Sequence, residues 1–130
     1  LGLKSQPALL FDRREPMVIE SFIQQIKEQE ATALIVIADT ISVRITQLLH
    51  YYQLSVPDDI SIITFNNSSY STLIHPYLTT FDINITNLGR ISFRRLLELI
   101  KSPKTSITEK IIVPFILRER ESVRQISGEE

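Results

Sequence analysis

Apolar residues in the first half of the chain alternate between helical and strand-like spacing. From Ile19 to Ile26 they recur every three or four residues, which predicts an amphipathic helix that begins near Pro16. The apolar runs at residues 8–11 and 33–38 predict strands. The second run is β-branched in its middle and has no polar position, so we expect it to be buried on both faces of a parallel sheet.

The following segments continue this alternation. Apolar positions on one face predict a helix over residues 41–52, and a turn-forming cluster at residues 56–59 leads into a strand at residues 60–65. Strand, helix, strand, helix, strand is the α/β pattern, which predicts right-handed crossovers and a parallel sheet wrapped by helices. The expected fold is therefore a three-layer α/β sandwich with a parallel sheet.

The second half of the chain is less regular. Residues 78–85 are expected to be extended and residues 88–100 to be helical. Residues 111–117 are expected to form an apolar strand in which Pro114 lacks an N–H donor, and this favours an edge position, a bulge or a passage between two sheets. The charged tail from Glu119 is expected to fray.

Composition limits the class of protein. The chain has 130 residues, 43% of them hydrophobic and 22% charged, as expected for one soluble globular domain. Its net charge of −1 offers no general attraction to a phosphate backbone, so this chain alone should bind DNA poorly. It has no cysteine and no apolar run that could span a bilayer, and a cytoplasmic location is expected. Because it begins with Leu1, we expect it to be part of a longer polypeptide.

Polar residues follow each of the first three predicted strands. Residues 12–15 follow the first strand, Asp39 and Thr40 the second, and Asn66 and Asn67 the third. The carboxyl ends of parallel strands share one edge of a sheet, where ligands bind in open α/β folds. Amides, hydroxyls and a carboxylate at that edge, without a nucleophile, suit a polyhydroxylated ligand.

Each of these residues also has a simpler structural interpretation. Asp39 could serve only as the N-cap of the helix that follows it, and Asn66 and Asn67 could be turn residues with left-handed backbone angles. Residues 12–15 could form a solvated charged loop. The arginines of the helix predicted at residues 88–100 are most simply its solvated side: Arg90, Arg94 and Arg95.

Signals for catalysis are weak. The two histidines, His50 and His75, are isolated in the sequence, so no cluster with the spacing of metal ligands is present. Three glycines at positions 2, 89 and 128 cannot form a glycine-rich phosphate loop. We therefore expect no cofactor, no metal and no enzymatic activity. An enzyme that uses Asp39 and His75 as acid and base is the catalytic alternative.

Four sequence blocks together resemble the lactose-repressor and galactose-repressor family of bacterial transcription regulators. In the order and spacing of that family, the blocks are residues 56–67 (VPDDISIITFNN), 75–80 (HPYLTT), 88–89 (LG) and 117–122 (LRERES). Within the family, residues 65–68 and 82–85 look most like those of maltose-responsive repressors.

This resemblance implies the C-terminal subdomain of a periplasmic-binding-protein type I fold, in which two subdomains close around a small ligand. Residues 3–81 would form the core of that subdomain, residues 82–112 would cross a hinge to a missing first subdomain, and residues 113–122 would return. The DNA-binding helix-turn-helix of such a repressor is absent from this chain. The implied function is sugar sensing, with maltose or a maltodextrin as effector, and dimerisation.

Five residues are candidate ligand contacts: Asp39, Asn66, Asn67, Asp82 and Arg14. The family usually has Asn-Asp at the end of the second strand, where this chain has Ala38 and Asp39, and often has Asp-Asp in place of the two asparagines. An amide both donates and accepts hydrogen bonds and a carboxylate only accepts, so we expect sugar binding with altered specificity.

The resemblance also implies a homodimer formed through the segments matching residues 41–54 and 70–76. Its apolar surface would consist of Ile41, Leu48, Tyr51, Tyr52, Tyr70, Leu73 and Ile74. These side chains could instead cover only the core of the chain itself. A solute receptor of the same fold, serving an extracytoplasmic transport system, is the alternative function.

Overall fold

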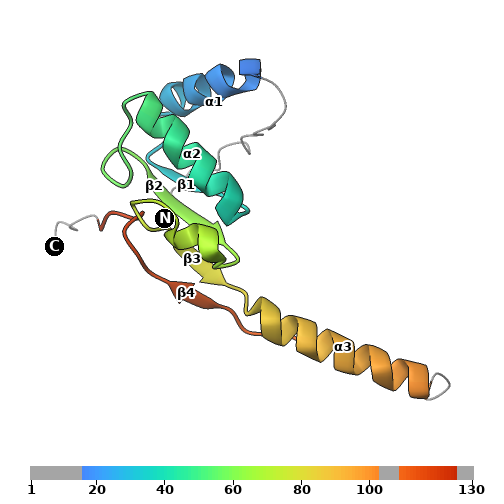
Figure 1. The fold of residues 1–130 in the computed structure, drawn as a ribbon. Coiled ribbons are helices and arrows are strands. Elements are labelled where there is room, and N and C mark those ends of the chain that lie inside the picture. The colour runs from blue at the N-terminus through green and yellow to red at the C-terminus, as the bar shows by residue number, and fades with distance from the viewer. Residues whose placement is uncertain (1–15, 103–108, 126–130) are drawn as a thin grey trace, which may run out of the picture.

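The structure is a computed structural model that describes residues 16–102 and 109–125. The predicted strand at residues 8–11 lies outside these residues. Figure 1 shows α1 and α2 together at one end of the sheet and α3 projecting from the other. In chain order the elements are α1 (Pro16–Glu28), β1 (Ala33–Ile35), α2 (Asp39–Tyr51), β2 (Ser61–Phe65), the 3-10 helix η1 (Ser69–Thr72), β3 (Thr79–Asp82), α3 (Ile85–Lys101) and β4 (Ile116–Arg118).

The four strands form one sheet in the order β1-β2-β3-β4. β1, β2 and β3 run parallel, and β4 pairs with β3 in the antiparallel direction. The register sets Leu34 beside Ile62 and Thr64 beside Thr80, so these side chains share one face. β4 lies at the edge of the sheet, as expected, but covers only Ile116–Arg118. The prediction of a strand over residues 111–117 is therefore wrong for residues 111–115, where Pro114 lacks the N–H that a ladder needs. An α/β fold with a mostly parallel open sheet is thus confirmed.

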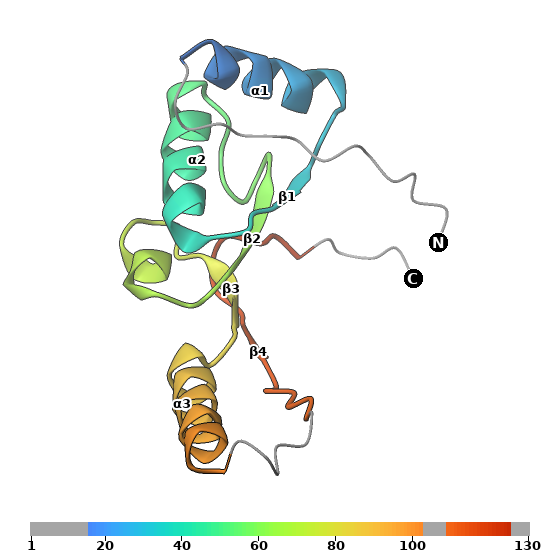
Figure 2. The ribbon, with the colours of Figure 1, turned by 90° about the vertical axis from the view of Figure 1, so that its right-hand side faces the viewer.

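The hydrophobic core lies between one face of the sheet and the helices α1 and α2 (Figure 2). Phe22, Ile23 and Ile26 of α1 are buried there, as their spacing predicts. Leu49 of α2 and Ile62 of β2 are fully buried in the same cluster. Removal of this apolar surface from water holds both helices on the same face of the sheet.

The buried face of α2 differs from the predicted one. Ser42 and Thr46 are buried, whereas Ile41 is only half-buried. The Ser42 hydroxyl donates to the Thr64 hydroxyl at 2.8 Å, and the Thr46 hydroxyl donates to the backbone carbonyl of Ser42 at 2.9 Å. Because their hydroxyls have partners, these small polar residues can be buried at little cost.

The second face of the sheet is exposed at β1 and in the residues that follow it. Ile35 and Ile37 are 75% and 77% exposed, so the prediction that residues 33–38 are buried on both faces is wrong. An uninterrupted apolar run indicates a strand but does not determine what covers its second face. The second helical layer of the predicted sandwich is not among the residues that the structure describes.

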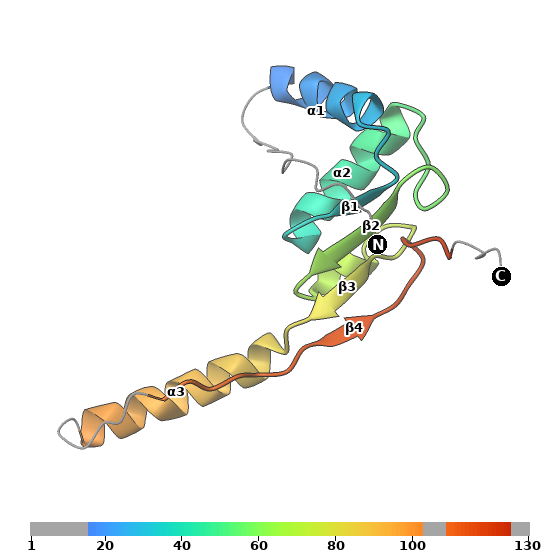
Figure 3. The same cartoon turned by 180° about the vertical axis from the view of Figure 1, so that it is seen from behind.

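α3 forms as predicted, begins three residues earlier than expected, and projects away from the sheet (Figure 3). No residue of α3 is buried. Its most exposed apolar side chains are 39–66% exposed: Ile85, Leu88, Phe93, Leu96, Leu97 and Ile100. Within the described part of the chain, the apolar side of α3 therefore faces solvent.

Residues 120–124 are held against the rest of the chain by hydrogen bonds, so the prediction that the tail frays from Glu119 is wrong for these described residues. Ser122 is fully buried. Its hydroxyl donates to the carbonyl of Ile62 at 2.6 Å and accepts from the N–H of Thr79 at 2.8 Å. Its carbonyl accepts from the N–H of Ile62 at 2.7 Å. One serine thereby joins β2 to β3, a role that the charge of the tail does not reveal.

Candidate functional site

The carboxyl end of β2 turns sharply through two asparagines. Asn66 has φ 93° and Asn67 has φ 50°, in the left-handed region that asparagine tolerates better than most residues. The N–H of Asn66 donates to the carbonyl of Phe81 on β3 at 2.9 Å. The interpretation of both residues as turn residues is therefore correct, and the turn places them at the edge where the parallel strands end.

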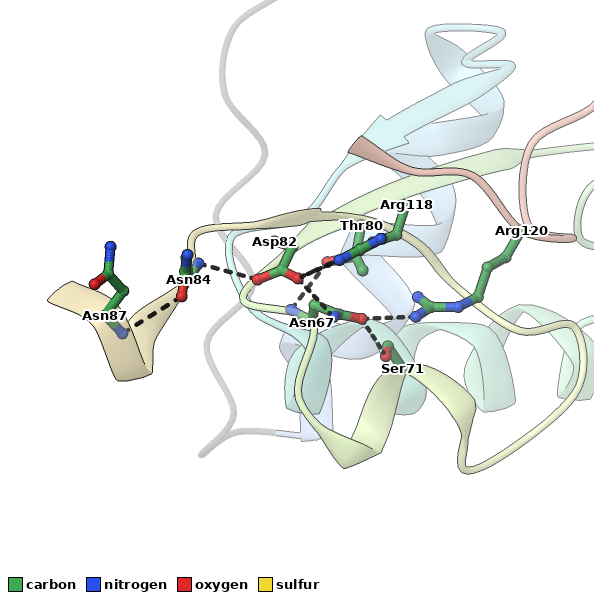
Figure 4. A network of polar contacts seen from close by, with 8 residues as sticks. All are labelled: Asn67, Ser71, Thr80, Asp82, Asn84, Asn87, Arg118 and Arg120. Carbon is green, nitrogen blue, oxygen red and sulfur yellow. Dashed lines mark hydrogen bonds and ion pairs between the residues drawn. The ribbon is translucent and has the colours of Figure 1, made fainter. Parts of the chain in front are cut away.

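Asn67 belongs to a network of polar side chains (Figure 4). Its Nδ2 donates to Asp82 Oδ2 at 3.1 Å, and its Oδ1 accepts from the Arg120 guanidinium at 2.6 Å. The Ser71 hydroxyl donates to the same Oδ1 at 3.5 Å, and the backbone N–H of Asn67 donates to the Thr80 hydroxyl at 3.3 Å. Both ends of the Asn67 amide are therefore occupied by other residues of the chain.

Asp82, at the end of β3, lies at the centre of this network. Its Oδ2 accepts two further bonds from the Arg118 guanidinium, each at 3.3 Å, and its Oδ1 accepts from the N–H of Asn84 at 3.0 Å. The Asn84 side chain in turn accepts from the N–H of Asn87 at 3.4 Å and caps α3. Asp82 thereby links β3, β4 and the start of α3, and its predicted direct contact with a ligand remains untested.

The backbone N–H of Asn84 holds the pKa of the Asp82 carboxyl below its ordinary value of 3.8, with help from Asn67 and Arg118 and against a smaller effect of desolvation. We expect a carboxyl-carbon NMR titration of Asp82 to give a pKa below 3.8. Its contribution to stability is then fully present above pH 3.8 and is lost as the pH falls through the lowered pKa. A measured value at or above 3.8 would contradict these contacts.

Asp39 is only 1% exposed. Its Oδ2 accepts from the N–H of Ser68 at 2.6 Å, and its Oδ1 accepts from the Thr80 hydroxyl at 3.3 Å. The N-cap of α2 is Ala38, so the N-cap interpretation of Asp39 is wrong. The burial of Asp39 and the use of both its oxygens do not support direct contact with a ligand. Instead, Asp39 fixes the loop after β2 against the start of α2.

Asn66 is the candidate whose side chain remains available. It is half-buried, and its amide makes no hydrogen bond to another described residue. The amide can donate two hydrogen bonds and accept two. The remaining candidate, Arg14, lies outside the described residues. Among the candidates that the structure describes, Asn66 therefore has the geometry best suited to a ligand contact.

Arg118 and Arg120 are site residues that the sequence reasoning missed, apart from their place in the block at residues 117–122. Arg120 donates to Asn67 Oδ1 and also to the carbonyl of Leu78 at 2.7 Å. Both arginines lie beyond the strand predicted at residues 111–117, and Arg120 also lies beyond β4. Their spacing along the sequence therefore did not point to Asp82 or Asn67 as partners.

The geometry does not support the acid–base alternative. Asp39 follows β1 at the carboxyl edge of the sheet, whereas His75 precedes the parallel strand β3 at the opposite edge. Nδ1 of His75 lies 2.8 Å from Glu121 Oε2, and its ring stacks on Tyr77.

In the described ranges, no three His, Asp or Glu side chains are grouped so that they could hold a metal ion. No helix in those ranges is long and apolar enough to cross a membrane.

The predicted dimer residues divide into two groups. Three are exposed, at 80%, 45% and 60%: Tyr51, Tyr70 and Leu73. Four are half-buried and pack against the core: Ile41, Leu48, Tyr52 and Ile74. Beside Ile74 lies a groove of about 460 Å³, lined by the end of α2, the connection at residues 54–56 and the loop at residues 74–76.

Known proteins share this sequence and this fold. Residues 5–123 match the family described as periplasmic binding protein-like domain. The arabinose metabolism transcriptional repressor of Geobacillus stearothermophilus is 29% identical over 109 residues, which are 84% of this chain and 30% of that protein. A solved LacI transcriptional regulator from Bacillus cereus subsp. cytotoxis has a TM-score of 0.74 and 26% identity, and the match covers 83% of this chain and 39% of that one.

A LacI family transcriptional regulator from Enterococcus faecium with bound ribose has a TM-score of 0.72 and 27% identity, over 82% of this chain and 40% of that one. The chain thus spans 30% to 40% of the length of these three relatives. They are named as transcriptional regulators and not as enzymes, in agreement with the predicted class and with the resemblance seen in four sequence blocks. The chain belongs to the family of periplasmic-binding-protein-like domains, and its relatives include transcriptional repressors of the lactose-repressor type.

Proposed function

We propose that this chain is part of the effector-binding domain of a bacterial transcriptional repressor, and that the effector is a sugar. The observation that carries the proposal is the amide of Asn66 at the carboxyl edge of the parallel sheet, which makes no hydrogen bond to another residue that the structure describes. The neighbouring amide of Asn67 is held in place by its own partners. Two of the relatives support a sugar: one is named for arabinose metabolism, and the other holds ribose.

The charged groups near Asn66 favour a neutral effector. Arg118 is paired with Asp82, and Arg120 donates to Asn67. Because these charged groups are used within the chain, amides and hydroxyls are the groups left for an effector. Such groups suit the hydroxyls of a sugar, whereas a phosphate or a carboxylate would need a free arginine or lysine.

Maltose or a maltodextrin is the specific effector that we propose, because residues 65–68 and 82–85 resemble those of maltose-responsive repressors. Isothermal titration calorimetry of the full-length protein with maltose, maltotriose, ribose and arabinose tests both levels of the proposal. Binding of ribose or arabinose without binding of maltose or maltotriose would support a sugar effector but contradict maltose or a maltodextrin as that effector. A folded protein that binds none of the four would contradict the sensor function.

We also propose the division of the chain in which residues 3–81 form the core of one subdomain, residues 82–112 cross to another, and residues 113–122 return. The exposure of the apolar side of α3 supports this division. A DNA-binding helix-turn-helix would then belong to a part of the protein outside this chain, and the repressor would act in the cytoplasm. A helix-turn-helix in the upstream coding sequence would support the repressor, whereas a signal peptide would support the solute receptor.

We propose that Tyr51, Tyr70 and Leu73 form part of a homodimer surface, since large apolar and aromatic side chains anchor protein interfaces. Leu73→Glu should raise the dissociation constant of the dimer about 30-fold or more, because it buries an unpaired charge. Sedimentation velocity of the full-length protein measures this shift. Ser21→Glu adds the same charge at an exposed position of α1, outside the predicted interface segments, and should leave the dimer intact. A dimer unaffected by Leu73→Glu would place the interface elsewhere.

A further inference from the structure

α3 and residues 109–115 form an arm that meets the rest of the chain at a narrow junction (Figure 1). β3 ends at Asp82, α3 begins at Ile85, and the chain rejoins the sheet at Ile116. No residue of α3 is buried, so burial in the described core does not fix the direction of the arm. The junction is instead held by polar contacts and by the edge-to-face packing of Phe115 on Phe81, whose ring centroids lie 5.4 Å apart.

One carboxylate connects this junction to the loop that follows β2. Asp82 Oδ2 accepts from the side chain of Asn67 in the loop, and Asp82 Oδ1 accepts from the N–H of Asn84 at the start of the arm. Arg118, on the strand through which the chain returns, donates to the same Oδ2. Figure 4 shows these side chains as one run of contacts that extends from Arg120 through Asp82 to the first turn of α3.

We propose that Asp82 is a hinge residue that couples the direction of the arm to the conformation of the loop at residues 66–71. Hydrogen bonds to an ionised carboxylate are stronger than bonds between neutral groups. The loop, the returning strand and the cap of α3 all donate hydrogen bonds to this one side chain. A movement of any one of them therefore alters the hydrogen bonds that Asp82 makes to the other two. The coupling requires no effector and therefore stands apart from the proposed sugar sensing.

The chemistry of the site makes Asp82→Asn a sharp test. All the groups that face Asp82 are donors: the Asn67 amide, the Asn84 N–H and the Arg118 guanidinium. An asparagine keeps the shape of the side chain but replaces one acceptor oxygen with an NH₂ donor. If the new NH₂ takes the place of Oδ2, it faces the donors of Asn67 and Arg118. If it takes the place of Oδ1, it faces the N–H of Asn84.

The experiment follows the arm and the loop separately in the 130-residue chain. Because the chain has no cysteine, Arg44→Cys on α2 and Arg94→Cys on α3 allow spin labels to be attached at two exposed positions only. Double electron–electron resonance then reports the distribution of distances between core and arm. We expect Asp82→Asn to widen this distribution about twofold and to speed amide exchange at residues 66–71 about five- to tenfold.

Arg118→Gln removes the guanidinium that donates two hydrogen bonds to Asp82 but keeps the contacts of Asp82 with Asn67 and Asn84. It should therefore change both measurements in the same direction by a smaller amount, even if Asp82→Asn prevents folding. Glu98→Gln is the control, since it breaks an ion pair with Arg95 inside α3 and leaves the junction intact. An unchanged distance distribution in Asp82→Asn and Arg118→Gln would overturn the proposal. So would a wider distribution without faster loop exchange, or an equal effect of Glu98→Gln.

Discussion

Ser122→Ala should lower the free energy of unfolding by about 2–4 kcal/mol. The Ser122 hydroxyl is fully buried and joins the carbonyl of Ile62 to the N–H of Thr79. Alanine removes both bonds, and each buried backbone group left without a partner costs about 1–3 kcal/mol. This is a large share of the total stability of a small domain, which is about 5–15 kcal/mol.

Urea unfolding of the chain, followed by circular dichroism, measures this loss. Ser92→Ala is the matched control, because Ser92 is exposed on α3 and its removal should change the free energy of unfolding by less than about 0.5 kcal/mol. A loss below about 1 kcal/mol for Ser122→Ala would mean that water or a shifted backbone replaces the serine. In that case the tail would not hold β2 and β3 together.

Asn66→Gly should weaken binding of the sugar effector to the full-length protein about 10- to 100-fold. The backbone of Asn66 has φ 93°, which glycine adopts without strain, so the substitution removes the amide while the turn is kept. Sugar hydroxyls that lose a partner in the bound state then lower the affinity. Calorimetry with the sugar that binds the unmodified protein measures the change.

A second left-handed residue provides the control for the glycine itself. Gln53 has φ 60°, is exposed after the end of α2, and precedes β2, whereas Asn66 follows β2 at the other end of the strand. Gln53→Gly should leave the affinity for sugar unchanged. Asn66→Asp retains acceptor oxygens but no donor, and we expect an affinity between those of the unmodified protein and Asn66→Gly. If the Asn66→Gly variant and the unmodified protein bound the sugar with equal affinity, Asn66 would not be an effector contact.

The helices and β2 could be predicted because burial of one side of a helix or strand leaves a periodic trace in the sequence. Phe22, Ile23 and Ile26 show this for α1. The apolar run at residues 33–38 shows the limit of the method. The composition of the run shows that the strand is suited to a hydrophobic core. Whether its second face is buried depends on other segments that pack against it, and Ile35 on that face is exposed.

The location of the candidate site was predictable, since parallel strands end at one edge of a sheet. The hydrogen-bond partners of each side chain at that edge could not be predicted. Asn67, unlike Asn66, has a described partner for its amide oxygen because Arg120, 53 residues away in the sequence, donates to it at 2.6 Å. The pairing of β3 with β4 brings it there, and no local pattern records that contact.

The position of Ser122 also sets the order of events during synthesis. The carbonyl and the N–H of Ile62 form hydrogen bonds with Ser122, which is synthesised 60 residues later. A ribosome that adds about 5–20 residues per second needs several seconds to make that stretch. Until residue 122 has been added, the pair formed by β2 and β3 lacks the two hydrogen bonds of the Ser122 hydroxyl. A chain terminated before residue 122 should therefore unfold more readily and be degraded faster than the longer chain.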